Sequence, residues 1–158
     1  MINLIAACDR NMLMGNQGKL PWNIRKDWDY FLKKTKGGIL IMGRTCYEDF
    51  QQHQQPHEVI VLSKAYSGNF KGAQRSYSLE GALQIAKTRK KPIWICGGRK
   101  VYEEAMPQAD YLYLTQIDSV FKGDVYFPPW KTTFTREISR VTEQENGITL
   151  HFTVYAKE

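Results

Sequence analysis

The sequence has no apolar run long enough to cross a membrane, only three cysteines, and no internal repeat or low-complexity tract. Because a membrane-spanning helix needs roughly 20 apolar residues in succession, we expect no membrane segment. Cys8, Cys46 and Cys96 lack the spacing of metal ligands, and their odd number fits a reducing compartment. The first residues carry no positively charged leader and predict a strand rather than a signal peptide. We therefore expect a cytoplasmic protein without a metal site.

What the sequence does contain is typical of one globular domain. Its 158 residues are 42% hydrophobic, which is enough for a substantial core, and we expect residues 1–158 to form a single domain. The net charge of +6 is spread over many segments. Such a charge fits nucleic-acid binding, but neither a nucleic-acid-reading motif nor a basic tail accompanies it. A small polyanionic ligand would use the same charges, and we expect a monomer with a small-molecule partner and neither nucleic acid nor membrane.

Strand-like and helix-like segments alternate along the chain. Short apolar runs bounded by glycine or proline predict strands, and apolar residues at helical spacing predict helices. The predicted strands are 2–8, 39–42, 59–62, 74–77, 92–96 and 111–117, followed by a hairpin of 134–141 and 148–155 around the Asn146-Gly147 turn. The predicted helices are about 24–35, a short one through Tyr47 and Phe50, one capped by Ser78, and one through Val101 and Met106. We predict an α/β fold: a single-domain, mostly parallel twisted sheet flanked by about four helices, with a C-terminal antiparallel hairpin at one edge.

The segment around Asp27 joins a loop to a helix. Pro21 ends the loop, and Asn23 is a suitable N-cap for the helix that follows. Apolar side chains from Ile24 to Phe31 recur at helical spacing and form a stripe beside Asp27. A carboxylate held against apolar surface is costly unless it is paired or functional. The alternative is a first-turn aspartate that the helix dipole stabilises, and this segment alone leaves both open.

Three predicted strands end in residues that suit phosphate groups. Gly43-Arg44-Thr45 and Gly97-Gly98-Arg99-Lys100 offer backbone amides and cations where helices begin, and Ser63-Lys64 offers a hydroxyl and an ammonium group. Together they suggest a ligand with a pyrophosphate and a further phosphate, such as NADPH. Each alone also fits an ordinary turn and cap, and the G-x-G-x-x-G fingerprint of common dinucleotide sites is absent after the first strand.

Several segments together carry a resemblance to a known family. They are Ile5-Ala6-Ala7; Leu20-Pro21-Trp22-Asn23 with Asp27 and Phe31; Ile41-Met42-Gly43-Arg44-Thr45; Val61-Leu62-Ser63-Lys64; Gly97-Gly98 with Val101-Tyr102-Glu103; Leu112-Tyr113-Leu114-Thr115-Gln116-Ile117-Asp118; and Gly123-Asp124 with Phe127-Pro128. In order and spacing they resemble the dihydrofolate reductase family over the whole chain. The resemblance implies an enzyme that uses NADPH to reduce 7,8-dihydrofolate to 5,6,7,8-tetrahydrofolate.

The resemblance also implies a catalytic group of Asp27, Trp22 and Thr115. Asp27 matches the carboxylate that binds the amino group and N3 of the pterin, Thr115 the hydroxyl that supports it, and Trp22 the residue that holds a nearby water. Asp27 would orient the pterin and promote protonation of N5 while hydride passes from the nicotinamide to C6. Gly97-Gly98 matches a cis peptide of the family.

The family's ligand-binding positions can be transferred in the same way. The loop from Gly15 to Leu20 matches a mobile loop that closes over the nicotinamide, and Gly123-Asp124 matches a loop that supports it. The expected substrate-binding residues are Ile5, Ala6, Ala7, Leu20, Trp28, Phe31, Phe50, His57, Cys96 and Tyr102. The expected cofactor-binding residues are Ala7, Gly15, Leu20, Gly43, Arg44, Thr45, Cys46, Leu62, Ser63, Lys64, Gly97, Gly98, Arg99, Lys100, Val101 and Tyr102.

Departures from the family concern mainly the glutamate tail of the substrate. His57 stands where an arginine that clamps the tail carboxylate is expected, and neighbouring Glu58 would repel a carboxylate. Gln54 replaces an apolar wall residue, Trp28 is bulkier than the usual residue, and Cys46 replaces a hydroxyl that helps to bind phosphate. We hypothesise that pterin binding and hydride transfer are kept, while the grip on the tail is weakened or rebuilt.

The sequence leaves several functions open. One is a folate reductase with a drifted tail site, or one in which Lys33 or Lys34 replaces the arginine; another is a reductase of a tail-less dihydropterin. A reductase of a ribosylaminopyrimidine is a further alternative, although Asp27, Trp22 and Thr115 favour a pterin. Outside the enzymes, a nucleotide- or nucleic-acid-binding module would show no NADPH oxidation and a steep salt dependence of nucleic-acid affinity.

Overall fold

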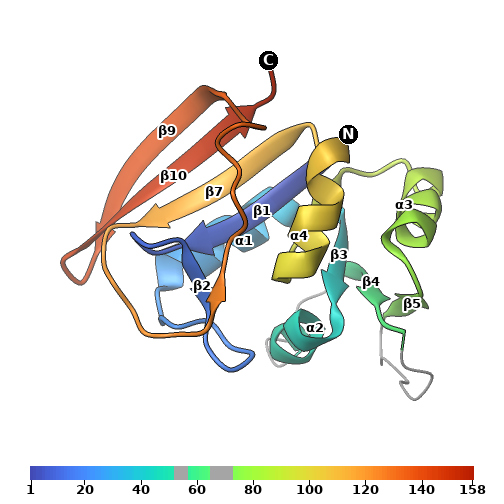
Figure 1. The fold of residues 1–158 in the computed structure, drawn as a ribbon, viewed down its shortest axis with the longest axis horizontal. Helices are drawn as coiled ribbons and strands as arrows, with labels where there is room; N and C mark the ends of the chain where they lie inside the picture. The colour runs from blue at the N-terminus through green and yellow to red at the C-terminus, as the bar shows by residue number, and fades with distance from the viewer. Residues whose placement is uncertain (52–56, 65–72) are drawn as a thin grey trace.

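The computed structural model describes residues 1–51, 57–64 and 73–158. The main sheet has eight strands in the order β5-β4-β3-β6-β1-β7-β10-β9 (Figure 1). These strands are β1 (Ile2–Cys8), β3 (Ile39–Gly43), β4 (Glu58–Leu62), β5 (Gln74–Ser76), β6 (Ile93–Ile95), β7 (Tyr111–Ile117), β9 (Arg136–Glu145) and β10 (Ile148–Ala156). The helices are α1 (Arg25–Thr35), α2 (Arg44–Gln51), α3 (Leu79–Thr88) and α4 (Arg99–Ala105), with a short 3-10 helix at Met106–Gln108.

The predicted fold class is confirmed. From β5 to β7 all neighbouring strands are parallel, while β10 pairs antiparallel with both β7 and β9. The hairpin of β9 and β10 thus forms one edge of the sheet, and β5 forms the other (Figure 1). Within the described ranges, no helix is long and apolar enough to cross a membrane.

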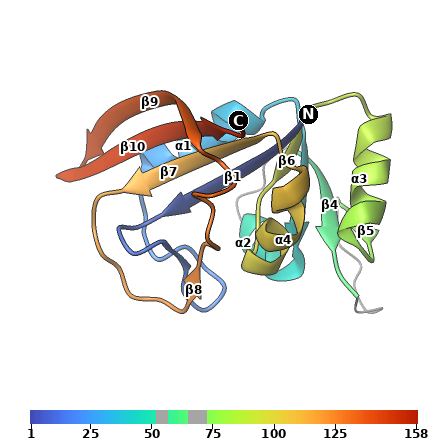
Figure 2. The ribbon, with the colours of Figure 1, turned by 45° about the horizontal axis from the view of Figure 1, so that its top comes forward.

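The central strands are buried on both faces, which explains their nearly continuous apolar sequences. Successive side chains of a strand point to opposite faces. Leu4 and Ile41 join the core that α3 and α4 cover, whereas Ile5 and Leu40 join a core with aromatic residues of α1 and α2. The sheet therefore lies between two helical layers, with α1 on the face opposite α4 (Figure 2).

The start of α1 differs from the prediction. Asn23 is not the N-cap: the helix begins at Arg25, and Ile24 occupies the cap position without a side-chain cap bond. Because the backbone of Ile24 is extended, the first free helical N–H groups fall one residue later than expected, and the Ile24 side chain is buried in the core. The carboxylate of Glu145, at the end of β9, accepts hydrogen bonds from the N–H groups of Arg25 (2.8 Å) and Lys26 (2.9 Å). A residue distant in sequence thus caps this helix.

Two short strands and the length of β9 were not predicted. β2 (Leu13–Gly15) and β8 (Val125–Tyr126) pair antiparallel in segments predicted as loops, because strands of three and two residues leave no readable pattern. β9 begins at Arg136 and continues to Glu145, past the predicted end at Val141, and almost all of it is exposed. The hairpin turn itself is confirmed, since Asn146 and Gly147 both have positive φ, at 51° and 78°.

Candidate active site

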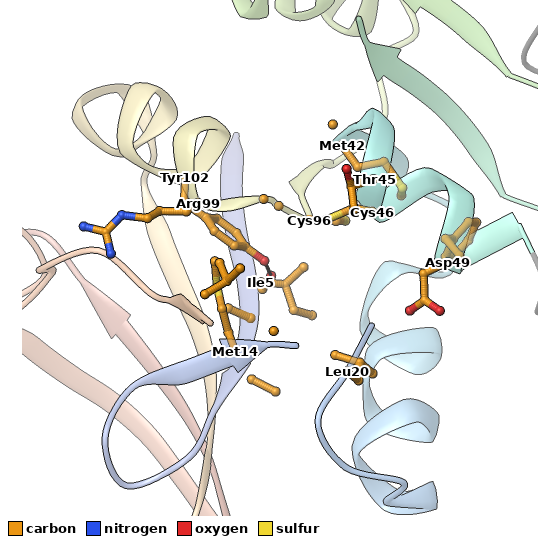
Figure 3. A pocket seen from close by; sticks show the side chains of 18 of the residues that line it. Ile5, Met14, Leu20, Met42, Thr45, Cys46, Asp49, Cys96, Arg99 and Tyr102 are labelled. Carbon is orange, nitrogen blue, oxygen red and sulfur yellow. Dashed lines mark hydrogen bonds between the residues drawn. The ribbon is translucent and has the colours of Figure 1, made fainter. Parts of the chain in front are cut away.

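A cavity of about 640 Å³ opens at the carboxyl edge of the parallel strands (Figure 3). The ends of β1, β3 and β7 line it, together with Gly97-Gly98 after β6 and residues of α1, α2 and α4. The 15–20 loop forms a further side, and it is tied to Asp124: the Gln17 N–H donates to the Asp124 carboxylate (3.2 Å), and the Asp124 N–H donates to the Gly15 carbonyl (3.0 Å). Open α/β sheets bind their ligands at this edge.

Asp27 lies in the first turn of α1 and is buried in the cavity wall. Only 8% of the residue is exposed, and the indole N–H of Trp22 donates a hydrogen bond of 3.1 Å to Oδ2. Burial raises the pKa of Asp27 from 3.8 to about 6; the Trp22 bond opposes this shift, and the charge of Glu145 adds to it. Asp29, by contrast, is exposed and lies 3.7 Å from Arg25. Asp27 does lie in the first turn of α1, as the helix-dipole alternative requires, but it is buried in the cavity wall and Asp29 is not.

Trp22 and Thr115 are both buried next to this site. Trp22 packs against Phe121, with ring centroids 5.4 Å apart, and its indole contacts the Asp27 carboxylate directly. Thr115 is paired with Ala7 of β1 and lines the cavity. Among the residues that the structure describes, no hydrogen bond joins Thr115 to Asp27, so the supporting role of Thr115 remains a prediction.

Aromatic side chains of α1 and α2 form one wall of the cavity. The rings of Trp28 and Phe31 are stacked at 5.3 Å, and Phe50 lies 6.2 Å from each of them. We call these three residues the aromatic wall. All predicted substrate-binding residues except His57 line the cavity: Ile5, Ala6, Ala7, Leu20, Trp28, Phe31, Phe50, Cys96 and Tyr102.

Tyr102 and the two glycines after β6 shape the opposite side. The Tyr102 hydroxyl donates to the Ile5 carbonyl at 2.7 Å, and burial raises its pKa well above the ordinary value, so it remains a donor. The Gly97-Gly98 peptide is cis, as the resemblance implied. Gly97 has a φ of +121°, and a Cβ there would lie 2.9 Å from the Cys46 sulfur, so only glycine fits.

Cationic and small residues line the end of the cavity near α2 and α4. All predicted cofactor-binding residues are found on its wall except Leu62, Ser63 and Lys64, which lie at the end of β4 outside it. The Arg44 guanidinium pairs with Glu48 at 3.0 Å. Arg99 points away from the cavity in Figure 3, because it binds Glu103 (2.7 Å) and the Tyr126 carbonyl (3.1 Å). Lys100 is the neighbouring cation on the wall.

His57 does not line the cavity but lies behind the aromatic wall. Its Nε2 is 3.1 Å from the Thr35 hydroxyl, which itself donates to the Phe31 carbonyl at 2.8 Å. Because the Thr35 hydroxyl gives its one proton to the Phe31 carbonyl, it can accept a hydrogen bond from Nε2–H of His57. Nδ1 is buried without a hydrogen-bond partner among the described residues, and burial lowers the pKa of His57. His57 is thus a neutral imidazole. Gln54 lies outside the described residues.

Gly18 and Lys19 line the cavity as part of the 15–20 loop expected over the nicotinamide. Five further residues that the sequence did not identify also line it: Met14, Tyr30, Met42, Asp49 and Val125. Met14 and Val125 lie in or beside the short ladder of β2 and β8, which was not predicted. Asp49 could have been found, because it follows the predicted site residue Cys46 by three positions in a predicted helix and therefore shares its face.

The comparisons with known proteins cover the whole fold. The sequence model of the dihydrofolate reductase family matches residues 1–157. Dihydrofolate reductase of Bacillus subtilis (strain 168) is 32% identical, over 100% of this chain and 95% of the relative's length. Dihydrofolate reductase type 3 of Salmonella typhimurium is 31% identical, over 100% of this chain and 99% of the relative's length. The structure of dihydrofolate reductase from Enterococcus faecalis, complexed with NADP(H) and RAB-propyl, matches with a TM-score of 0.92 at 28% identity, covering 100% of this chain and 96% of that one.

A cavity at the carboxyl edge of the sheet, one buried carboxyl group in its wall and these matches agree, and the chain belongs to the dihydrofolate reductase family, as its sequence motifs predicted.

Proposed function

We propose that this protein reduces 7,8-dihydrofolate to 5,6,7,8-tetrahydrofolate with NADPH, by transfer of a hydride to C6 of the pterin and a proton to N5. The observation that supports this most is Asp27, a single carboxyl group buried in an otherwise mainly apolar region of the cavity. A carboxylate there can accept hydrogen bonds from two neighbouring N–H groups of a flat heterocycle. Family membership favours this enzyme over a nucleotide- or nucleic-acid-binding module.

Asp27 would act on the pterin by position and by charge. The Trp22 indole occupies Oδ2, so we assign Oδ1 to the ligand together with the remaining lone pair of Oδ2. With a pKa of about 6, Asp27 is ionised at neutral pH when no ligand is bound. Its negative charge, buried where water screens little, raises the proton affinity of a ring nitrogen held nearby. The proton itself would come from water, and Asp27 would hold the ring where N5 can receive it.

The residues at the other end of the cavity fit a dinucleotide. NADPH supplies the hydride when bound, and the Enterococcus faecalis relative is complexed with NADP(H). A Cβ on Gly43 would lie 3.7 Å from the Gly98 nitrogen, so the absence of side chains keeps the space between the two strand ends open. Arg44, Thr45 and Lys100 would hold phosphate groups there, and Gly97 would let the backbone approach the nicotinamide.

A second candidate, a reductase of a tail-less dihydropterin, is supported by His57. Its neutral imidazole, bound to Thr35, offers neither the permanent charge nor the fork of donors that an arginine gives to a carboxylate. Lys33 and Lys34 do not line the cavity, and Lys34 lies 5.6 Å from the Tyr30 ring centroid. From these positions outside the cavity wall, neither lysine replaces the arginine that would bind the tail carboxylate.

A steady-state assay separates these functions. NADPH consumption is followed with dihydrofolate and, in parallel, with a short dihydropterin that lacks the aminobenzoyl-glutamate tail. Consumption with dihydrofolate at the lower KM is the expected result. A lower KM for the short dihydropterin would favour the second candidate, and consumption with neither substrate would overturn the proposed function.

A further inference from the structure

The tip of the C-terminal hairpin reaches the start of α1. Glu145 is the last residue of β9 and pairs with Ile148 of β10 across the Asn146-Gly147 turn. Its two carboxylate oxygens accept one hydrogen bond each from the first two N–H groups of the helix, Oε2 at 2.8 Å and Oε1 at 2.9 Å. Because the two-residue turn fixes where β9 ends, it also fixes where this carboxylate lies.

The first turn of α1 has no cap of its own. Ile24 occupies the cap position without a side-chain cap bond, and the first bond within the helix runs from the Trp28 N–H to the Ile24 carbonyl at 3.3 Å. The N–H groups that precede Trp28 in the helix therefore lack helical partners, and Glu145 binds two of them. Asp27 is the next residue along the chain, in the same turn. A hairpin residue far away in the sequence thus holds the turn that carries Asp27.

Glu145 also acts on Asp27 by its charge. The bonds from the two backbone N–H groups lower the pKa of Glu145, so it is ionised at neutral pH. Burial is the main cause of the raised pKa of Asp27, and the negative charge of Glu145 adds to it. The other titratable side chains that face Asp27 are Cys8 on β1 and Tyr102 on α4; burial raises the pKa of both, so they are uncharged. Among the described residues, Glu145 is thus the ionised group that adds to the proton affinity of Asp27.

The cationic side chains in the first turn of α1 are engaged elsewhere. The Arg25 guanidinium lies 3.7 Å from Asp29, and the Lys26 ammonium group lies 3.5 Å from Glu143, an acid earlier on β9. Within the described ranges, no ion pair joins Glu145 to either cation. Glu145 therefore meets the backbone of the turn, where its charge interacts with the positive end of the helix dipole.

We propose that Glu145 is a positioning residue for the reaction: its carboxylate holds the first turn of α1 in place, and its charge strengthens Asp27 as a hydrogen-bond acceptor for the pterin. This inference rests on the proposed function, in which Asp27 binds the pterin. Glu145 does not line the cavity, so it acts through α1 and Asp27. A carboxylate of higher proton affinity accepts hydrogen bonds from ring N–H groups more strongly. The edge of the sheet thus contributes to substrate binding without touching the substrate.

Titration of Asp27 itself tests this inference. The protein is isotopically labelled at its aspartate carboxyl carbons for NMR, and the Asp27 resonance is identified by its absence in Asp27→Asn. Its chemical shift is followed against pH in wild type, in Glu145→Gln and in the matched control Glu143→Gln, which removes the same charge from an exposed position of the same strand. In parallel, kcat/KM for dihydrofolate is measured by NADPH consumption at the same pH values, because its pH dependence reports groups of the free enzyme.

In Glu145→Gln we expect the pKa of Asp27 to fall by about half a unit, roughly a threefold change in proton affinity, because a nearby negative charge no longer opposes ionisation. The apparent pKa of kcat/KM should fall by the same amount. The glutamine oxygen can still accept one of the two backbone hydrogen bonds, so the fold should be kept, and thermal unfolding verifies this. Glu143→Gln should leave the pKa of Asp27 nearly at its wild-type value.

Two results would overturn the inference. One is an unchanged pKa of Asp27 in Glu145→Gln, even if kcat/KM falls by the same factor at every pH, because Glu145 would then act only as a helix cap. The other is an equal fall of this pKa in Glu143→Gln. Absence of NADPH consumption by the wild type would instead overturn the proposed reaction, and the titration of Asp27 would still decide the role of Glu145.

Discussion

Replacing Asp27 by asparagine should stabilise the protein while it removes the group proposed to bind the pterin. Burial raises the pKa of Asp27 from 3.8 to about 6, and one pKa unit corresponds to about 1.4 kcal/mol. Ionising Asp27 in the folded protein therefore costs about 3 kcal/mol relative to the unfolded chain. Asparagine keeps an oxygen that can accept the Trp22 hydrogen bond and carries no charge.

The sign of the effect depends on pH. Well below pH 3.8 the carboxyl group is protonated in both folded and unfolded states, and the two proteins should be equally stable. As the pH rises from about 4 to about 6, the unfolded wild type ionises while the folded wild type keeps its proton, so the wild type loses stability and the variant does not. Asp27→Asn should thus be more stable by about 3 kcal/mol at pH 8, with most of the difference developing between about pH 4 and 6.

Urea unfolding of both proteins at pH 4 and pH 8 measures this difference, because the other titrating groups cancel when the two proteins are compared at each pH. Asp29→Asn, on the exposed side of the same helix, serves as the control and should not show the same pH dependence. A difference between Asp27→Asn and wild type that is equal at both pH values, or a variant that is less stable at pH 8, would refute the reasoning that burial dominates at Asp27.

Three further predictions concern individual contacts. Gly97→Ala should lower the free energy of unfolding by about 1–3 kcal/mol, because φ is positive and the new Cβ meets the Cys46 sulfur. The double variant Gly97→Ala with Cys46→Ala removes the contact with the sulfur but not the positive φ, so its thermal melt should show that only part of the lost stability is recovered. Glu145→Ala should lower the stability by removing the cap of α1, and no change in the urea midpoint would contradict this. His57→Ala should change the KM for dihydrofolate by less than about twofold, since a neutral imidazole offers no charge; a tenfold rise would show that His57 grips the tail.

The sheet could be predicted because its order depends on local patterns. The apolar run from Ile39 to Met42 is buried on both faces, as expected of a central parallel strand, and the Asn146-Gly147 turn fixes the final hairpin. The start of α1 could not be predicted in this way. Its cap is Glu145, 119 residues away from Lys26, and a local pattern such as Asn23 before the helix contains no information about that contact.

Site residues were predictable where the local structure or chemistry accepts only one type of residue. The glycine at Gly97 and the buried carboxyl group of Asp27 are examples, and the family resemblance identified both before the fold was known. The direction of a long side chain is set by its neighbours in space instead. The Arg99 guanidinium binds Glu103 and the Tyr126 carbonyl, and the His57 ring is held by Thr35 behind the aromatic wall. The hydrogen-bond partners of Arg99 and His57, and therefore the directions of their side chains, depend on tertiary contacts that the sequence pattern does not show.

The central claim, that the Asp27 carboxylate acts on the pterin, is tested most directly by a single-turnover measurement. Wild-type and Asp27→Asn proteins, each saturated with NADPH, are mixed with limiting dihydrofolate, and the loss of reduced nicotinamide is followed. We predict that the variant binds NADPH with unchanged affinity and transfers hydride at least about 100-fold more slowly. Hydride transfer by Asp27→Asn at the wild-type rate would contradict the account.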